Sequence, residues 1–459
     1  MVTGKRSNRI AVRDMTQGRP MRLILGFSMP MILGNLFQQF YTLIDTMIVG
    51  RFLGKLALAG VGSTGAVNFL IVGFCIGTSS GFAIPVAQRF GAGDHAGLRR
   101  FVANAVYLGA MISAAVTIVV TLLCGRILNA MNTPADVYPY AYSYILVIFL
   151  GLPVTLCYNL LAGIIRALGD SRHPLIFLVI SALVNIALDL FFIRGLGLGV
   201  TGAALATVLS QVLASVCCLV FMRTSLEILR FKPGEMAPDR DHMRKLLAMG
   251  LPMGLQYSIT AVGSVILQTA VNGLGSDAVA AVTAAARVSM FFCCPFDALG
   301  TAMSTWGGQH VGAKKLDRVG EGLKDSVLLG GVYSVLAFGI LWFFGRDLAG
   351  LFVDAGESAL LDAAHTFLIV NSAFYIPLAL VNIVRFLIQG LGFPTFAILA
   401  GVCEMIARIT VAAVLVPAAG FFGACFANPC AWIAADLFLI PAYFHEMKKL
   451  RRLFARPRA

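Results

Sequence analysis

The chain has 459 residues, of which 59% are hydrophobic and only 12% are charged. A soluble globular protein usually carries about 25% charged residues, so this composition excludes an ordinary soluble domain and indicates a membrane protein. The net charge of +13 does not indicate nucleic-acid binding, because the basic residues lie between apolar runs and form no surface stripe. The ten cysteines lie mostly inside apolar runs without a CxxC motif, so we expect them to be apolar filler and expect no cofactor.

Twelve apolar runs reach the length of roughly 20 residues that a spanning helix needs. In chain order they cover approximately residues 23–50, 57–84, 101–123, 137–165, 174–194, 200–222, 246–271, 278–303, 326–344, 363–388, 394–416 and 422–444. Gly and Pro recur within them, which spanning helices tolerate where neighbouring helices satisfy the freed backbone groups. The sequence therefore predicts an all-α polytopic membrane protein with twelve transmembrane helices.

Lysine and arginine are shared unevenly between the two sides of these spans. Most of the 35 fall in alternate gaps, such as 89–100 and 223–245, and Arg385 near the end of the tenth span is assigned to the same set. Cytoplasmic loops carry an excess of these residues. We therefore expect a multi-pass protein of a prokaryotic plasma membrane, with both termini in the cytoplasm.

The sequence repeats itself weakly at an offset of about 221 residues. FSMPMILG aligns with MGLPMGLQ, FLGKLALAGV with GLGSDAVAAV, and AQRFGAG with GQHVGAK, while Gly199 and Gly202 align with Gly420 and Gly423. Four matches in order indicate a duplication. Each half contains six spans, so the two halves share one orientation and a pseudo-two-fold axis runs along the membrane normal, with a binding site expected near their interface.

The duplication divides the chain into two lobes and three polar segments. The predicted parts are a cytoplasmic N-terminal tail 1–22, an N-lobe 23–222 with spans 1 to 6, a cytoplasmic linker 223–245, a C-lobe 246–444 with spans 7 to 12, and a basic cytoplasmic tail 445–459. We expect the lipid bilayer and small organic substrates as partners, no nucleic acid, and a monomeric chain.

Ionisable residues inside spans are costly and usually face a bundle interior or a wet cavity. Asp45 and Asp189 each lie about five residues, roughly 7 Å, from the outer ends of spans 1 and 5. Asn185 shares a helix face with Asp189, Thr207 in span 6 reaches a similar layer, and Tyr41 lies one turn below Asp45. Two carboxylates, an amide and a hydroxyl without a nearby basic residue form an oxygen-rich cage that suits Na⁺ or a proton shared between like charges.

The C-lobe spans contain a second set of charged residues. Glu404 and Arg408 are four residues apart with the acid first, the spacing of a helical ion pair. Asp297 and Arg287 are ten residues apart, close to three turns, so they either pair with each other or line a cavity. We expect these four residues to support the cavity or the coupling, and Asp436 stays unassigned.

Four motifs recur in the order known from one transporter family. They are IDTMIVGRFLG after span 1, VAQRFGAGD after span 2, RALGDSRHP after span 4 and GQHVGAKKLDRV after span 8. Together they cover nearly the whole chain, which resembles the multidrug and toxic compound extrusion (MATE) transporters, one branch of a superfamily of flippases and exporters. The resemblance implies two six-helix lobes in a V that open alternately to each side, and export driven by inward Na⁺ or H⁺ rather than enzymatic activity.

The resemblance also implies a cation site. Many prokaryotic members use an aspartate in span 1, an asparagine and an aspartate one turn apart in span 5, and a threonine in span 6. On this chain the matching residues are Asp45, Asn185, Asp189 and Thr207. Some members have carboxylates in spans 7 and 10, where this chain offers Gln256, Gln268 and Asn371, so we expect no C-lobe cation site of that type.

Two rival functions are weighed against export of amphipathic, cationic compounds. A lipid-linked sugar or polysaccharide flippase of the same superfamily often lines its cavity with several arginines for phosphates, whereas only Arg287 and Arg408 qualify here. A membrane-embedded prenyl-transfer enzyme needs clustered aspartates for Mg²⁺-bound pyrophosphate, and no DxxxD or DDxxD run lies at a span end. The sequence therefore favours a cation-coupled antiporter.

Overall fold

The structure is a computed structural model that describes residues 14–353 and 357–455. Residues 1–13 of the predicted N-terminal tail and 456–459 of the predicted C-terminal tail lie outside the described residues. The helices in chain order are α1 (Pro20–Ser63), α2 (Gly65–Gly91), α3 (His95–Ala130), α4 (Tyr138–Leu150), α5 (Leu152–Ala167), α6 (Arg172–Leu190), the π-helix η1 (Phe191–Gly195), α7 (Gly199–Ser225), the 3₁₀ turn η2 (Glu227–Leu229), α8 (Arg240–Asn272), α9 (Ser276–Gly312), α10 (Leu316–Ala349), α11 (Ser358–Ala373), α12 (Tyr375–Gly390), α13 (Thr395–Thr410), the π-helix η3 (Val411–Leu415), α14 (Val416–Cys425) and α15 (Ala427–Ala455).

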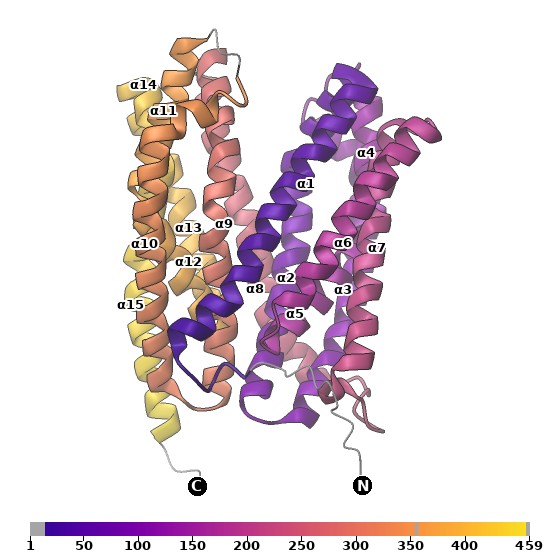
Figure 1. Ribbon diagram of the computed structural model, residues 1–459, viewed down its shortest axis with the longest axis vertical. Coiled ribbons are helices and arrows are strands. Elements are labelled where there is room, and N and C mark those ends of the chain that lie inside the picture. The colour runs from indigo at the N-terminus through magenta and orange to yellow at the C-terminus, as the bar shows by residue number, and fades with distance from the viewer. Residues whose placement is uncertain (1–13, 354–356, 456–459) are drawn as a thin grey trace, which may run out of the picture.

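These helices form twelve spans in two lobes. Within the described ranges, 8 helices are long and apolar enough to cross a membrane, and two bent pairs, α4 with α5 and α11 with α12, raise that number to 10. The remaining two spans are α1 and α15, which run alongside the others (Figure 1). The predicted all-α, twelve-helix, two-lobe layout is confirmed.

Several span boundaries differ from the predicted ones because helices bend inside the membrane. The second span was expected from residue 57, but α1 continues to Ser63 after a break at Gly54, where φ is 83°. Only glycine adopts this left-handed region without strain. The fourth and tenth spans are each two helices, bent by 48° and 51°. Hydrophobic length predicts a span and contains no signal for a bend inside it.

The duplication is visible in the backbone. Residues with positive φ pair off between the lobes at an almost constant offset: Gly54 with Gly275, Gly93 with Lys314, Gly169 with Gly392, and Gly199 with Gly420. The π-helices η1 and η3, and the two bent pairs, also occupy corresponding places in the two lobes. The repeat found in the sequence is therefore a repeat of backbone conformation.

The two lobes meet at one end of the molecule, where α2 ends at Gly91 and α9 ends at Gly312. Both described chain ends lie at this end, which we call the base, and the lobes diverge toward the opposite end (Figure 1). A Cβ on Gly91 would lie 1.9 Å from the carbonyl oxygen of Gln309, and a Cβ on Gly312 would lie 1.9 Å from that of Gln88. This reciprocal contact places the pseudo-two-fold axis between the two helix ends.

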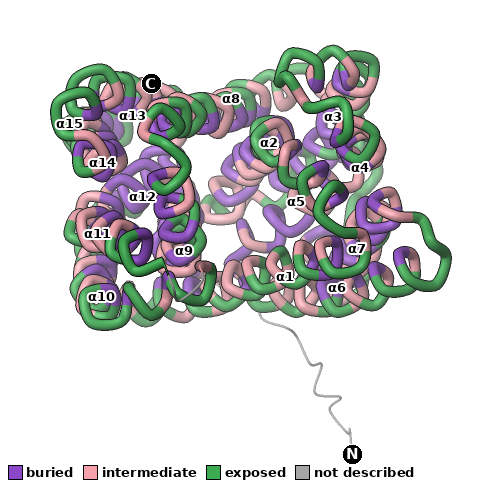
Figure 2. The backbone as a smooth tube through the Cα atoms, turned by 90° about the horizontal axis from the view of Figure 1, so that it is seen from above, coloured by how far each residue is buried: buried purple, intermediate pink, exposed green. Residues whose placement is uncertain are grey.

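The same two glutamines join the lobes by hydrogen bonds. Gln88 Nε2 of the N-lobe donates to the carbonyl of Gly390 at the end of α12, at 3.1 Å. Gln309 Nε2 of the C-lobe donates to the carbonyl of Ala167 at the end of α5, at 2.9 Å. Seen along the long axis, α1, α2, α8 and α9 lie where the two groups of helices face each other (Figure 2). The base is therefore a packed, hydrogen-bonded junction.

The segment before α1 crosses under the base to the C-lobe. Met15 is fully buried, and its backbone N–H donates to Gln309 Oε1 at 2.9 Å. Lys315 Nζ donates to the carbonyl of Thr16 at 3.1 Å, and Arg318 Nη2 donates to that of Gly18 at 2.5 Å. We call residues 14–19 the N-terminal strap.

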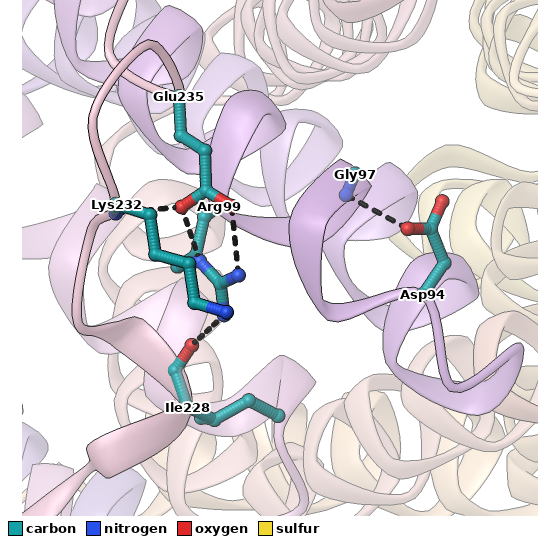
Figure 3. A network of polar contacts seen from close by, with 6 residues as sticks. All are labelled: Asp94, Gly97, Arg99, Ile228, Lys232 and Glu235. Carbon is teal, nitrogen blue, oxygen red and sulfur yellow. Dashed lines mark hydrogen bonds and ion pairs between the residues drawn. The ribbon is translucent and has the colours of Figure 1, made fainter.

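The linker that leads from α7 into α8 is fastened to the N-lobe, whereas the N-terminal strap is fastened to the C-lobe. Glu235 accepts from Arg99 Nε at 2.5 Å and from Arg99 Nη2 at 2.8 Å (Figure 3). Arg99, at the start of α3, also donates to the carbonyl of Ile228 at 3.2 Å. The backbone N–H of Asp239 donates to Asn104 Oδ1 of α3 at 2.8 Å. Each lobe's first helix is thus preceded by a segment fastened to the other lobe.

Candidate functional site

The predicted N-lobe cage is built from three helices. Asp45 lies on α1, Asn185 and Asp189 lie on the last two turns of α6, and Thr207 lies on α7. Asn185 and Asp189 are fully buried, and Asp45 is 8% exposed. The carboxyl groups of Asp45 and Asp189 lie close enough for their charges to interact. Two acids that are 144 positions apart in the numbering are therefore neighbours.

The polar atoms of the cage lack protein partners. Within the described ranges, both oxygens of Asp189, Oδ1 of Asp45 and both amide atoms of Asn185 are buried without a hydrogen bond. Neither aspartate forms an ion pair with any described residue. An unpaired buried carboxylate is strongly unfavourable, so a cation or a proton in the cage would be stabilising.

Two tyrosines border the cage. The Tyr41 hydroxyl of α1 lies 3.3 Å from Thr207 Oγ1, and Thr207 Oγ1 also donates to the carbonyl of Ala203 at 3.1 Å. Tyr144 of α4 lies close enough to Asp45 and Asp189 for their charges to act on it. Tyr144 was missed from the sequence because its bent span gives no indication that α4 faces α1.

A π-helical turn follows the cage directly. η1 begins two residues after Asp189, and such turns frequently occur at functional sites because they displace the helix backbone locally. At a deeper level Gly34 of α1 faces Leu175 and Leu178 of α6. The Gly34 contact shows that α1 and α6 pack against each other below the cage.

The C-lobe charges form a separate, buried cluster. Glu404 and Arg408 of α13 form the expected i, i+4 ion pair, with 3.6 Å between Arg408 Nη1 and Glu404 Oε2. Arg385 of α12 also binds Glu404, through Arg385 Nη2 and Glu404 Oε1. The assignment of Arg385 to a cytoplasmic gap is wrong, because this residue lies inside α12 and is only 6% exposed.

Three further charged residues lie outside this ion pair network. Asp436 of α15 is buried near Arg385 and Glu404, and its Oδ1 has no hydrogen bond to a described residue. Asp297 of α9 is exposed and lies close enough to Arg385 for their charges to interact. Arg287 is exposed, and in the described ranges it forms no ion pair with Asp297. None of these residues joins the N-lobe cage.

The uncharged residues of spans 7 and 10 have structural partners. Gln256 of α8 accepts from Gln389 Nε2 of α12 at 2.6 Å, and Gln268 donates to Asn272 one turn later at 2.9 Å. Asn371 donates to the carbonyls of Phe367 and Cys425 at 2.9 and 3.3 Å, where α11 bends into α12.

A protein-family model described as MatE matches residues 30–191 and 252–414. The two matched stretches correspond to the two halves of the duplication and together cover more than half of the chain. The chain belongs to the MATE family of multidrug efflux transporters. It is a multi-pass membrane transporter rather than an enzyme.

Individual relatives agree with this assignment. This MATE transporter is 28% identical over 371 residues to the probable multidrug resistance protein YpnP of Bacillus subtilis, covering 81% of this chain and 82% of that protein. It is 24% identical over 396 residues to an FAD transporter of Shewanella oneidensis, covering 84% and 85%. A solved structure described as the outward-facing conformation of a multidrug resistance MATE family transporter has a TM-score of 0.90 at 21% identity, covering 97% of this chain and 99% of that one. This last likeness shows the fold.

Proposed function

We propose that this MATE transporter exports amphipathic, cationic organic compounds in exchange for an inward-moving Na⁺ or H⁺, which binds at Asp45, Asn185, Asp189 and Thr207. The observation that supports the proposal is the pair of buried, adjacent carboxylates of Asp45 and Asp189 without a basic partner. Two such groups are stable together only when a positive charge neutralises part of theirs.

The coupling follows from the position of the cage between α1, α6 and α7. With the base on the cytoplasmic side, as the lysine and arginine distribution predicts, the lobes diverge toward the outside and the cage is loaded from there. Neutralisation removes the repulsion between the two acids and lets α1 repack against α6 and α7. Pro30, inside α1, lacks an N–H for the helix ladder and permits bending at that point.

The energy for export must come from a difference in ion affinity between the two states. Coupling free energies of this kind are typically on the order of 1–3 kcal/mol. A deformation of α1 at Pro30 that opens or closes the cage supplies such a difference, because the two carboxylates are neighbours in one packing of α1 and separated in the other.

The flippase alternative gains no support from the C-lobe arginines. A phosphate group needs several accessible arginines, whereas Arg385 and Arg408 are both paired with Glu404 and both are 6% exposed. Of the two arginines that the sequence offered, only Arg287 is exposed. The exposed charge near them is the carboxylate of Asp297, which attracts cations and repels phosphates.

The decisive experiment is export of ethidium from proteoliposomes under separately imposed Na⁺ and pH gradients. We expect one of the two gradients to drive export, and we expect Asp45→Asn and Asp189→Asn each to reduce driven export at least tenfold, since either change removes half of the cation's charge partner. The control is Asp347→Asn, an exposed carboxylate at the far end of α10. Wild-type export by both cage variants at normal membrane levels would refute the proposed coupling site.

A further inference from the structure

The buried arginine of α12 lies among three carboxylates but binds only one of them. Arg385 Nη2 contacts Glu404 of α13. Asp297 of α9 lies close enough to Arg385 for their charges to interact, and Asp436 of α15 lies close enough to both Arg385 and Glu404. Arg385 Nε is buried without a hydrogen bond to any described residue. The guanidinium is therefore incompletely satisfied where it lies.

The packing of α9 on α12 places Asp297 at nearly the depth of Arg385. A Cβ on Gly300 would lie 2.8 Å from the ring of Phe386, and a Cβ on Gly390 would lie 2.2 Å from the carbonyl oxygen of Ser304. These two contacts fix the register of the parallel pair. Asp297 and Arg385 are then offset by about two residues, roughly 3 Å along the axis, which is within the reach of an arginine side chain.

Asp297 differs from the other acids of the C-lobe in its exposure. Glu404 is 3% exposed and Asp436 is 7% exposed, whereas Asp297 is exposed on α9 and forms no ion pair with a described residue. Tyr257 of α8 lies near both Asp297 and Arg385. An exposed carboxylate beside an aromatic ring provides a site for the positive end of an amphipathic cation.

We propose that Arg385 is a built-in competitor for the substrate: Glu404 holds it away from Asp297, and its release lets it pair with Asp297 and displace a bound organic cation. The inference rests on the proposed export of cationic compounds and assigns Asp297 as the residue that recognises their charge. Arg385 acts through Asp297 and is a positioning residue.

Loss of the negative charge on Glu404, as in Glu404→Gln, is what releases Arg385. The charged groups that face Glu404 are Arg385 from α12, Arg408 from α13 itself and Asp436 from α15. From the packed helix α8, the Gln256 side chain lies against Gly401, about one turn before Glu404, and Tyr257 lies near Arg385 and Asp297. With Glu404 neutral, Asp436 and Asp297 remain as the carboxylates near Arg385, and Asp297 is the one that is exposed.

The test is equilibrium binding of tetraphenylphosphonium to the purified full-length transporter in detergent, measured by calorimetry without any ion gradient. We expect Asp297→Asn and Glu404→Gln each to weaken binding about tenfold, the size of one charge-assisted contact. We expect Glu404→Gln with Arg385→Gln to bind within about threefold of wild type, because the competitor has been removed. Glu321→Gln, an exposed acid of α10, is the matched control.

Three results would overturn the inference: unchanged binding in Glu404→Gln, no recovery in the double variant, or weaker binding in Arg385→Gln alone. The single Arg385 variant tests the idea even if Glu404→Gln does not fold, because removing a competitor cannot lower affinity. Intact tetraphenylphosphonium binding without gradient-driven export would refute the proposed coupling and leave this inference standing. If the transporter shows gradient-driven export but Asp297→Asn binds tetraphenylphosphonium with wild-type affinity, this inference is refuted and the proposed coupling stands.

Discussion

At the scale of single residues, the two lobes handle buried charge in opposite ways. The N-lobe brings Asp45 and Asp189 together without a basic partner, and the C-lobe surrounds Glu404 with Arg385 and Arg408. The second arrangement supplies its own cations, whereas the first has none. This contrast supports the proposal that the coupling ion or proton binds in the N-lobe.

Removing the acid of the C-lobe cluster should destabilise the fold. Glu404→Ala leaves two buried arginines without their carboxylate, and breaking a buried ion pair from one side typically costs about 3–5 kcal/mol. We expect a loss of this size in the free energy of unfolding, measured by denaturant titration in mixed micelles. Glu321→Ala, on an exposed position of α10, should change the same quantity by less than about 0.5 kcal/mol. Equal effects of the two changes would contradict the described cluster.

At the scale of helices, close packing depends on glycine at the base and between α2 and α8. A Cβ on Gly81 of α2 would lie 2.6 Å from Cα of Gly250, and one on Gly77 would lie 2.5 Å from the carbonyl oxygen of Met253. Such distances show that the helix backbones touch directly, as small residues allow in membrane bundles. The same requirement applies at Gly91 and Gly312, where the lobes meet.

Adding one methyl group at the base should open it. Gly91→Ala and Gly312→Ala each place a Cβ against a carbonyl oxygen of the other lobe, at 1.9 Å before relaxation, so the helix ends must separate. We expect a larger population of molecules with a parted base, measured as longer distances between spin labels on Ala96 and Glu321 in a cysteine-free background. Gly339→Ala on α10, where a Cβ meets nothing within 4 Å, should leave the distances unchanged. A wild-type distance distribution in both variants would show that the contact does not control closure.

At the scale of the whole molecule, two segments hold the base closed by crossing between the lobes. The N-terminal strap is fastened to Gln309, Lys315 and Arg318 of the C-lobe. The linker is fastened to Arg99 of the N-lobe through Glu235. Because the crossings run in opposite directions, any separation of the lobes at the base stretches both segments.

The linker contact should act as a latch that does not respond to physiological pH. The hydrogen bonds from Arg99, and then the backbone N–H of Lys232, lower the pKa of Glu235 to about 2. An unfolded glutamate titrates near pH 4.3, so the contact contributes fully above that pH and is lost only as pH falls toward about 2. We expect Glu235→Gln to lengthen the distances between labels on Ala96 and Glu321 equally at pH 5 and pH 8.

The control for the latch is Arg100→Gln, which removes a neighbouring charge from an exposed position of α3. It should not change the label distances at either pH. A wild-type distance distribution in Glu235→Gln, or an effect of the same size in Arg100→Gln, would show that net charge rather than the specific contact holds the linker.

The sequence alone determined the membrane class, the twelve spans and the duplication, and it predicted a similar depth for Asp45 and Asp189. These follow from hydrophobic length and residue counting, because depth along a spanning helix is proportional to residue number. Only the tertiary structure decided that Arg385 joins Glu404, that Tyr144 borders the cage, and that the strap and linker cross between lobes. Those contacts depend on how helices rotate, bend and pack against segments far away in the chain, and the spacing of residues along one helix contains no information about that.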